Sequence, residues 1–167
     1  MESSTITTET HPPPTAGALL RLAWLEFRAR LFDRVQEAGY TDLLPMHLIL
    51  FRYPTIDGLR PGQLAEQMGI SKQAINDLLR QLEALGYLER KRDPSDGRAR
   101  LIVLTPRGQG LMDVLYQAAG EIAAEWASIV GQERYDALRE TLLEILAATG
   151  TRKSPAAVQA SGPNGAD

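Results

Sequence analysis

The chain has 167 residues, of which 44% are hydrophobic, and its formal net charge at pH 7 is −3. This length fits one domain, or one domain with arms, and the apolar content is sufficient for a core. Because there is no cysteine, disulfides, cysteine-based zinc sites and thiol oxidation sensing are excluded. The N-terminus lacks the basic start and apolar core of a secretory signal, and no apolar run reaches membrane-spanning length. We therefore expect a cytoplasmic protein with no membrane partner.

The two ends of the chain differ in composition from the middle. Residues 1–16 are rich in Thr and Pro, and residues 150–167 are rich in small residues and Pro. Segments of this composition bury too little apolar surface to fold alone. We predict disordered tails at both ends and a single domain over residues 17–149.

The first predicted element is an amphipathic helix over residues 18–38. Apolar side chains recur near one face at helical spacing, namely Leu20, Trp24, Phe27, Leu31 and Val35. Three further apolar residues, Leu22, Leu25 and Phe32, widen that stripe. A short apolar helix is predicted next, over residues 43–53.

Two short helices joined by a glycine turn follow in residues 63–85. The first begins after Gly62, carries a narrow apolar stripe and ends at Gly69, a residue that takes a positive φ without penalty. Ser71 is placed as the N-cap of the second helix. The apolar residues of that helix recur at spacings of three and four; they are Ile75, Leu78, Leu79, Leu82 and Leu85. Gly86 ends the helix.

The opposite face of this second helix is polar. It carries Lys72, Gln73, Asn76, Asp77 and Arg80, most of them close to the helix N-terminus. In a helix-turn-helix, that end of the second helix enters the major groove. Gln and Asn suit adenine edges there, whereas Arg and Lys suit guanine or phosphate. A solvated face on an ordinary bundle helix would give the same pattern, so the helix pair alone leaves both readings open.

Two strands and a tight turn follow the helix pair. Residues 87–90 are typical of a short strand, residues 93–97 form a dense turn signal, and residues 101–104 form a β-branched-rich second strand. Thr105 followed by Pro106 is an N-cap before a proline at the first helical position, so a helix begins there. This order of elements favours a winged helix-turn-helix.

Basic residues concentrate in the same part of the chain. Residues 60–108 contain nine Lys or Arg and six Asp or Glu, a net charge of +3 within an acidic protein. The densest group flanks the predicted turn and comprises Arg90, Lys91, Arg92, Arg98 and Arg100. Phosphate neutralisation requires such a local patch rather than a basic protein.

Two more amphipathic helices are predicted at residues 111–130 and 134–148. Their apolar stripes, with that of the first helix, are wider than the wing module can cover. We expect these helices to pair with a second copy of the chain. Two-fold dimers are the commonest assembly, and two DNA half-sites are bound by two copies of a DNA-binding domain. A monomeric helical bundle is the alternative. The predicted fold is mainly α with a small β-wing: a winged helix-turn-helix lobe at about residues 55–108 plus terminal dimerisation helices at 18–38 and 111–148.

The amino-acid sequence of the predicted wing is more specific than that of the helix pair. The run over residues 93–108, DPSDGRARLIVLTPRG, resembles the wing signature of the MarR family of bacterial transcription regulators. The sequences of residues 63–65 and 82–87 are also similar to those of that family. The order of elements extends the resemblance to roughly residues 18–147. The resemblance implies a dimeric DNA-binding regulator. It also implies that Arg98 enters the minor groove and that Asp96 orients it.

One position departs from the family pattern. Asp77 lies where many relatives carry a basic or neutral residue. An acid facing DNA repels phosphate unless it accepts from a cytosine amine or pairs with Arg80 or Lys72. The base preference is therefore open at this position.

The predicted partner is double-stranded DNA carrying a pseudo-palindromic operator, bound by a homodimer. The predicted DNA-binding residues are Ser71, Lys72, Gln73, Asn76, Arg80, Arg90, Asp96, Arg98 and Arg100. Among them we assign Gln73, Asn76 and Arg80 to base edges, and Ser71 and Lys72 mainly to phosphates.

Catalytic and metal chemistry is not indicated. Of the two histidines, His11 lies in the predicted tail and His47 in an apolar segment, where a lone histidine is more often a core or pocket-rim residue than a base or ligand. No second histidine or carboxylate stands at metal-ligand spacing, and no glycine-rich phosphate loop is present. We expect no enzyme activity, no metal and no cofactor.

The resemblance also implies an apolar crevice for a small effector between the dimer helices and the DNA lobe. Residue types that suit such a site are Trp24, Arg28, Tyr40, Met46, His47 and Phe51. Plain core packing is the alternative for the aromatic residues. The predicted function is a repressor released by a small aromatic or amphipathic ligand. The alternatives are a constitutive DNA-binding regulator without an effector and a winged-helix protein-interaction module.

Overall fold

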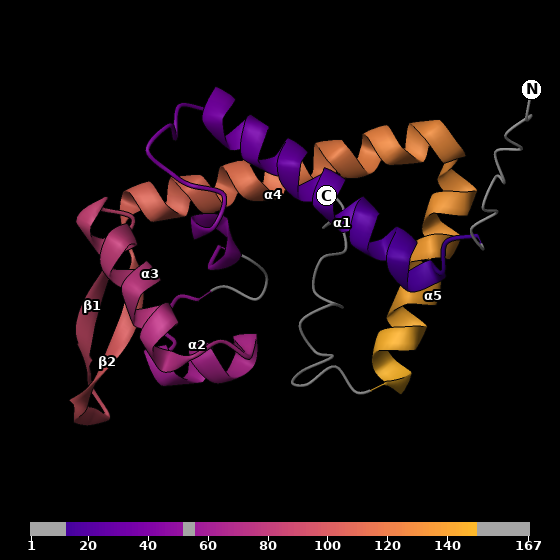
Figure 1. Ribbon diagram of the computed structural model, residues 1–167. Helices are drawn as coiled ribbons and strands as arrows, with labels where there is room; N and C mark the ends of the chain where they lie inside the picture. Colours follow the sequence, from indigo (N-terminus) through magenta and orange to yellow (C-terminus); the bar gives the residue numbers. More distant parts are fainter. Residues whose placement is uncertain (1–12, 52–55, 150–167) are drawn as a thin grey trace, which may run out of the picture.

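A computed structural model describes residues 13–51 and 56–149 (Figure 1). Its elements in chain order are α1 (Ala16–Glu37), the 3-10 helix η1 (His47–Ile49), α2 (Pro61–Met68), α3 (Lys72–Ala84), β1 (Leu88–Asp93), β2 (Asp96–Leu104), α4 (Pro106–Val130) and α5 (Gln132–Ala148). The mainly α class with a small antiparallel wing is confirmed. The predicted tails lie outside the described residues at 1–12 and 150–167, and Ala16 already belongs to α1.

Helix α4 connects the two parts of the molecule. Its first turns lie beside α3 and the hairpin, and α5 folds back from its far end (Figure 1). Helix α1 packs along the middle and distal part of α4 (Figure 1). The winged-helix lobe and the terminal helices therefore share one continuous helix of 25 residues.

The short apolar helix predicted over residues 43–53 is wrong. Only His47–Ile49 is helical, and it forms a single 3-10 turn. Pro45 has no N–H and disfavours the helical conformation at the residue before it. The N–H of that residue, Leu44, instead donates to His47 Nδ1 at 3.1 Å. Residues 52–53 lie outside the described residues.

The helix ends follow the local chemistry of the sequence. Gly69 ends α2 with φ 64°, in the left-handed region that favours glycine. The Ser71 hydroxyl accepts from the Ala74 amide at 3.2 Å and caps α3, and Thr105 caps α4 in the same way. Helix α2 begins at Pro61, two residues earlier than predicted, because proline tolerates the first helical position.

The hairpin is longer and tighter than predicted. Leu88 pairs with Leu104, Arg90 with Ile102, and the ladder continues to a pair between Asp93 and Asp96. The predicted five-residue turn over residues 93–97 is therefore reduced to two residues between the strands. Alternation along β1 directs Leu88 and Arg90 toward the same face, where Ile102 and Leu104 are buried.

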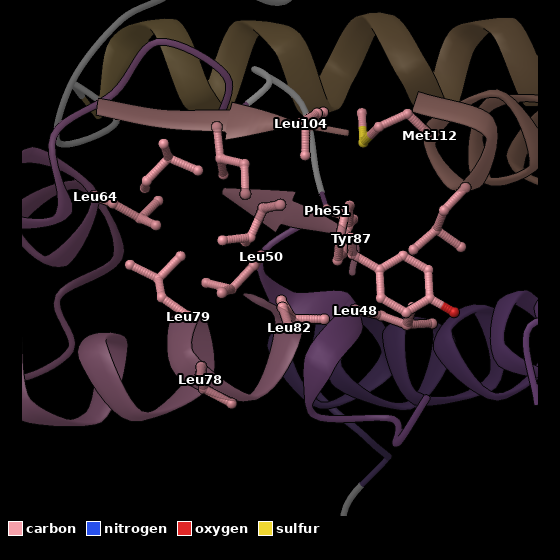
Figure 2. Close-up of a cluster of buried hydrophobic side chains, with 14 of the residues drawn as sticks. Leu48, Leu50, Phe51, Leu64, Leu78, Leu79, Leu82, Tyr87, Leu104 and Met112 are labelled. Atoms are coloured by element: carbon pink, nitrogen blue, oxygen red, sulfur yellow. The ribbon is translucent and has the colours of Figure 1, made fainter. Parts of the chain in front are cut away.

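The apolar core lies inside the winged-helix lobe. Figure 2 shows its side chains between α3, the hairpin, the η1 segment and the start of α4; the labelled members are Leu48, Leu50, Phe51, Leu64, Leu78, Leu79, Leu82, Tyr87, Leu104 and Met112. Helix α1 contributes one fully buried residue, Val35, and α5 contributes none. Hydrophobic burial therefore stabilises the lobe directly, but the terminal helices much less.

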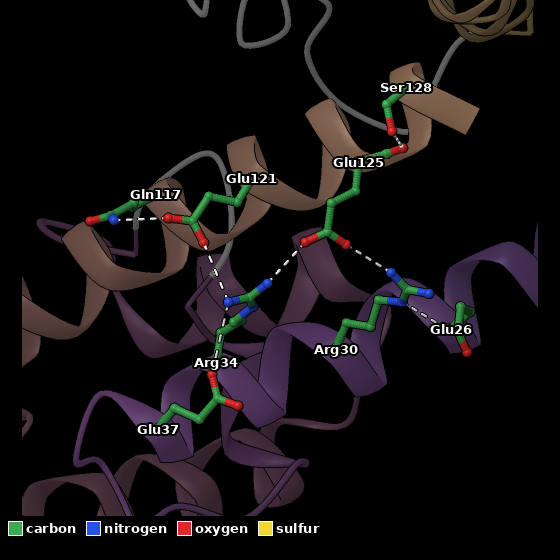
Figure 3. A network of polar contacts seen from close by, with 8 residues as sticks. All are labelled: Glu26, Arg30, Arg34, Glu37, Gln117, Glu121, Glu125 and Ser128. Carbon is green, nitrogen blue, oxygen red and sulfur yellow. Dashed lines mark hydrogen bonds and ion pairs between the residues drawn. The ribbon is translucent and has the colours of Figure 1, made fainter. Parts of the chain in front are cut away.

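Charged side chains join α1 to α4 beyond this core (Figure 3). Glu125 accepts from Arg30 Nη1 at 2.8 Å and from Arg34 Nη2 at 2.9 Å, so two arginines one turn apart share one carboxylate. Each of these side chains remains about 40% exposed, so a single pair stabilises little. Together they fix the register of α1 along α4.

Large apolar side chains remain exposed on the terminal helices. On α1 they are Leu19, Leu20, Leu22, Trp24 and Leu25, and on α5 they are Leu138, Leu143, Ile145 and Leu146. Ile129 and Val130 at the end of α4 are 74% and 40% exposed. This exposed apolar surface lies on the helices that the sequence assigns to dimerisation.

Candidate nucleic-acid interface

Helix α3 presents a polar end to solvent. Ile75, Leu78 and Leu79 anchor one face in the core, while Lys72 and Gln73 are exposed in the first turn. The unpaired backbone N–H groups of this turn add a partial positive charge. Because the Ser71 hydroxyl uses only its acceptor in capping, its proton can still be donated to a phosphate.

Asn76 is engaged within the protein, unlike its neighbours in the first turns. Its Nδ2 donates to the Lys72 carbonyl at 2.9 Å, and its Oδ1 accepts from Arg90 Nη1 at 3.2 Å. The base contact predicted for Asn76 would require this arrangement to open. Arg90 was also predicted to contact DNA, but its side chain is only 22% exposed and lies against α3.

Asp77 pairs with Arg80 on the same helix face. This is one of the two pairings that the sequence offers for an acid at this position, so its charge is compensated locally. Arg80 is 70% exposed, and it therefore remains close to the surface that would meet a base or phosphate. The predicted base contact by Arg80 stays a prediction.

The tip of the wing is held to the beginning of α2. Arg60 Nε and Nη2 donate to Asp93 Oδ2 at 2.8 and 2.5 Å, and the other Asp93 oxygen accepts from the Ser95 amide and hydroxyl. The hydrogen bonds from Ser95, together with Arg60, lower the pKa of Asp93 to about 2. The carboxylate is thus charged and nearly buried at neutral pH. The sequence indicated Asp93 only as a turn residue and did not single out Arg60.

The contact predicted between Asp96 and the Arg98 side chain is not formed in the described structure. Asp96 Oδ1 accepts from the Arg98 backbone amide at 3.1 Å, and Oδ2 lies 3.5 Å from Arg60 Nη1. The carboxylate therefore shapes the backbone of the turn rather than the guanidinium, as short Asp side chains commonly do in turns. Arg98 and Arg100 are exposed along the hairpin, where a nucleic acid could reach them.

A profile described as the MarR family matches residues 42–99, which span the segment after α1, the helix pair and most of the hairpin. The winged helix-turn-helix of this chain is therefore similar to that of the MarR family. The family resemblance inferred from the wing is thereby confirmed for the lobe that carries the predicted DNA-binding residues.

Two curated relatives agree with this assignment. The HTH-type transcriptional regulator TtmR of Methylorubrum extorquens is 33% identical over 79 residues, which cover 46% of this chain and 40% of the relative. The transcriptional activatory protein BadR of Rhodopseudomonas palustris is 29% identical over 94 residues, which cover 56% of this chain and 53% of the relative. The chain thus matches about half or less of the length of these relatives.

Solved structures support the fold beyond the matched segment. MarR of E. coli in its apo form superposes with a TM-score of 0.66 at 18% identity, over 81% of this chain and 99% of that chain. The repressor CouR bound to a 23-mer DNA duplex gives a TM-score of 0.60 at 23% identity, over 78% of this chain and 92% of that chain. The terminal helices therefore belong to the MarR-type fold as well.

The six predicted ligand-binding residues are not brought together in one protomer. Trp24 is 56% exposed and stacks on Phe27 at 6.0 Å, within an aromatic group on α1 and α4 that includes Trp126. Met46 is 52% exposed, whereas Phe51 is buried. Arg28 alone lines a surface hollow, described below. No hollow among the described residues of the single protomer is lined by all six, and the predicted ligand site stays a prediction.

His47 is a core residue, as its sequence context indicated. It is 3% exposed; its Nδ1 accepts from the Leu44 amide, and Nε2 lies 2.8 Å from Gln81 Oε1. Because Nδ1 accepts, the proton belongs on Nε2, which donates to Gln81. The ring links the η1 segment to α3 and leaves neither nitrogen for a ligand.

A polar joint that the sequence did not indicate lies where α3, α4 and the segment after α1 meet. Arg107 donates to Asp42 at 2.9 Å and to the Leu85 carbonyl at 2.7 Å, and its guanidinium lies 4.4 Å from the Tyr87 ring centre. The Tyr87 hydroxyl donates to Asp42 at 2.6 Å. Burial and the Asp42 carboxylate raise the pKa of Tyr87, whereas the hydrogen bond from Tyr87 and the charge of Arg107 lower that of Asp42.

Residues 13–51 and 56–149 contain no helix that combines the length and apolar character needed to cross a bilayer. The same ranges hold no group of three or more acidic or histidine side chains placed to bind a metal ion.

Proposed function

We propose that this chain is a sequence-specific DNA-binding transcriptional regulator that acts as a homodimer. The observation that carries the proposal is the arrangement of two exposed polar surfaces on one rigid lobe. The first turn of α3 presents Lys72 and Gln73, and the hairpin beside it presents Arg98 and Arg100. A helix that enters the major groove and a wing that reaches the adjacent minor groove require this side-by-side placement.

The charge distribution supports the same proposal. Residues 60–108 carry a net charge of +3, whereas the whole chain carries −3. A basic lobe on an acidic body orients the protein toward a phosphate backbone and repels it elsewhere. We therefore expect a steep dependence of DNA affinity on salt concentration.

The terminal helices support the dimer. The apolar side chains of α1 and α5 are largely exposed in the single protomer, and Leu138 is 47% exposed. A second copy would remove this surface from water by packing the same helices across a two-fold axis. Two lobes related in this way would read half-sites about 34–36 Å apart, one turn of the duplex.

Selection of bound duplexes from a random pool, followed by sequencing, tests the DNA-reading proposal. We expect enrichment of a pseudo-palindrome, and we expect anisotropy titrations with the enriched duplex to weaken sharply as salt rises. A protein-interaction module predicts no enrichment and no salt-dependent binding to any duplex. That result would overturn the proposal.

We propose further that the DNA-bound protein represses transcription and that a small amphipathic acid releases it. A hollow of about 220 Å³ lies on α1, lined by Leu25, Arg28, Ala29, Phe32, Asp33 and Pro45. Its apolar side chains suit an aromatic ring and Arg28 suits a carboxylate, which must bind on the side of the hollow away from the Asp33 carboxylate. Such a ligand acts only if it binds the DNA-incompetent spacing of the lobes more tightly than the competent one.

A panel of aromatic carboxylates and phenols, screened by thermal shift, tests this second proposal. An effector should raise the melting temperature and, by reciprocity, bind less tightly when the selected duplex is present. Arg28→Ala should abolish both effects. If no compound does both, the constitutive regulator replaces this proposal. Activation in a purified transcription assay would overturn repression, and BadR carries the name of an activatory protein.

A further inference from the structure

Arg90 occupies an unusual place for a basic residue of a DNA-binding wing. On β1 it follows the inward-facing Leu88 by two residues, and it is paired with the fully buried Ile102. Its side chain therefore begins on the apolar face of the hairpin, and only its guanidinium extends past this layer. The first polar groups that it meets belong to α3.

The guanidinium contacts α3 at two positions about two helical turns apart. Nη1 and Nη2 donate to the side-chain and backbone oxygens of Asn76 at 3.2 and 3.4 Å. Nε is buried without a hydrogen bond and lies 3.3 Å from a carboxylate oxygen of Glu83. A planar group held at both Asn76 and Glu83 resists rotation as well as sliding of the helix.

We infer that Arg90 and Asn76 are positioning residues that fix the recognition helix against the wing and thereby set sequence discrimination. The inference rests on the proposed DNA-binding function and assigns these two residues roles other than direct contact. Base readout depends on the distance between α3 and the wing, since both must meet their grooves together. Arg90 can reach a phosphate only by leaving Asn76 and Glu83.

Positioning and phosphate binding make opposite predictions for a conservative substitution. Lysine at position 90 keeps the positive charge but has no planar fork, so it can satisfy a phosphate but not the paired oxygens of Asn76. A phosphate contact would therefore survive Arg90→Lys. A positioning contact would not.

The experiment measures affinity for two probes, the duplex selected from the random pool and a random-sequence duplex of equal length. We expect Arg90→Lys to lower the ratio of the two affinities about tenfold, as the loss of charge-assisted hydrogen bonds would. Affinity for the random duplex and the slope of log affinity against log salt should match those of the wild type. Arg100→Gln is the contrasting variant: it should weaken binding to both probes and reduce the slope by about 1.8, because each dimer loses two phosphate contacts.

Asn76 is tested through its dependence on Arg90. If it acts through the arginine, Asn76→Ala should cost little selectivity in the Arg90→Lys background, although it costs selectivity in the wild type. Additive losses would show that Asn76 reads bases independently and would overturn its positioning role. Asn76→Asp retains the acceptor for Arg90 and should keep most of the selectivity. This variant tests the inference even if Arg90→Lys fails to fold, and complete loss of selectivity in Asn76→Asp would count against it.

These outcomes separate the inference from the proposed function. Wild-type selectivity and a shallower salt slope in Arg90→Lys would overturn the positioning role while leaving DNA binding intact. Equal affinity of the wild type for all duplexes would overturn sequence-specific binding, and the inference with it.

Discussion

Asp93 is the residue of the wing whose protonation should matter most. Its pKa falls from 3.8 to about 2 because Ser95 and Arg60 hydrogen-bond to the charged form. A lowered folded-state pKa stabilises the fold above the unfolded pKa of about 3.9, and this contribution is lost as pH falls from about 4 to about 2. Asp93→Asn should therefore lower the melting temperature at pH 7 and flatten its decline below pH 4, as measured by circular dichroism. Asp113→Asn, at an exposed carboxylate on α4, is the matched control. If the melting temperature of Asp93→Asn fell below pH 4 as steeply as that of the wild type, the lowered pKa of Asp93 would not stabilise the fold.

Gln73 is the exposed residue of α3 best placed to read a base. Its side chain is exposed in the first turn and makes no hydrogen bond with another described residue. Gln73→Ala should cost about 1–3 kcal/mol of binding to the selected duplex and relax base choice at one position per half-site. Repeating the selection with the variant measures this directly. Gln109→Ala, exposed at the start of α4, should leave the profile unchanged. A wild-type profile for Gln73→Ala would mean that another residue reads this position.

At the scale of elements, α4 must begin in close contact with the backbone between α3 and β1. A Cβ at Gly108 would lie 2.0 Å from the Tyr87 carbonyl oxygen, whereas a Cβ at Gly120 of the same helix would meet open space. We expect Gly108→Ala to destabilise the protein by about 1–3 kcal/mol through overpacking. Gly120→Ala should stabilise it by about 0.5–1 kcal/mol, because alanine loses less entropy in a helix. Urea unfolding of the two variants checks both signs. Equal effects would mean that α4 can shift away from Tyr87 without cost.

The hairpin should contact DNA through its exposed arginines unequally. If Arg98 enters a narrow minor groove, it meets a more negative potential than Arg100 nearer the phosphates. Arg98→Ala should therefore weaken binding more than Arg100→Ala in fluorescence anisotropy. Because Asp96 holds the Arg98 backbone amide and Arg60, Asp96→Ala should also weaken binding although it removes a negative charge. Tighter binding by Asp96→Ala would mean that its charge outweighs its role in the turn.

For the whole molecule, the exposed faces of the terminal helices predict how the dimer can be broken. Leu138 on α5 is 47% exposed, and a carboxylate there would be buried without a partner in the proposed interface. Leu138→Glu should weaken the dimer by about 2 kcal/mol or more, measured by light scattering across a dilution series. Leu44→Glu is the matched control, since Leu44 is 52% exposed but lies outside the terminal helices. A wild-type monomer at micromolar concentration would overturn the dimer itself.

The sequence predicted features that are set by short-range chemistry. Gly69, Ser71 and Thr105 were identified correctly as helix ends because caps depend on residues three or four positions away. The apolar stripe of α3 identified its buried face for the same reason. Pro45 is a local signal against a helix over residues 43–53, and it outweighs the apolar pattern of that segment.

Contacts between distant residues could not be predicted in the same way. Asp93 is 33 positions from Arg60, and Asp42 is 65 positions from Arg107, so only the packed fold brings each pair together. The net charge of the lobe counts every arginine alike, whether its guanidinium faces solvent or another side chain. The structure uses Arg60 and Arg90 within the lobe, and the ligand-binding residues chosen by type lie in separate places.

Helix α4 runs without interruption for 25 residues from the joint at Arg107 to the end of the terminal helices. At 1.5 Å per residue it is about 37 Å long. A rigid rod of this length acts as a mechanical lever: a tilt of about 5° at one end displaces the other by about 3 Å, close to the rise of one base step. In a dimer with two such rods, a rearrangement of a few side chains near Val130 would therefore change the separation of the recognition helices by whole base pairs.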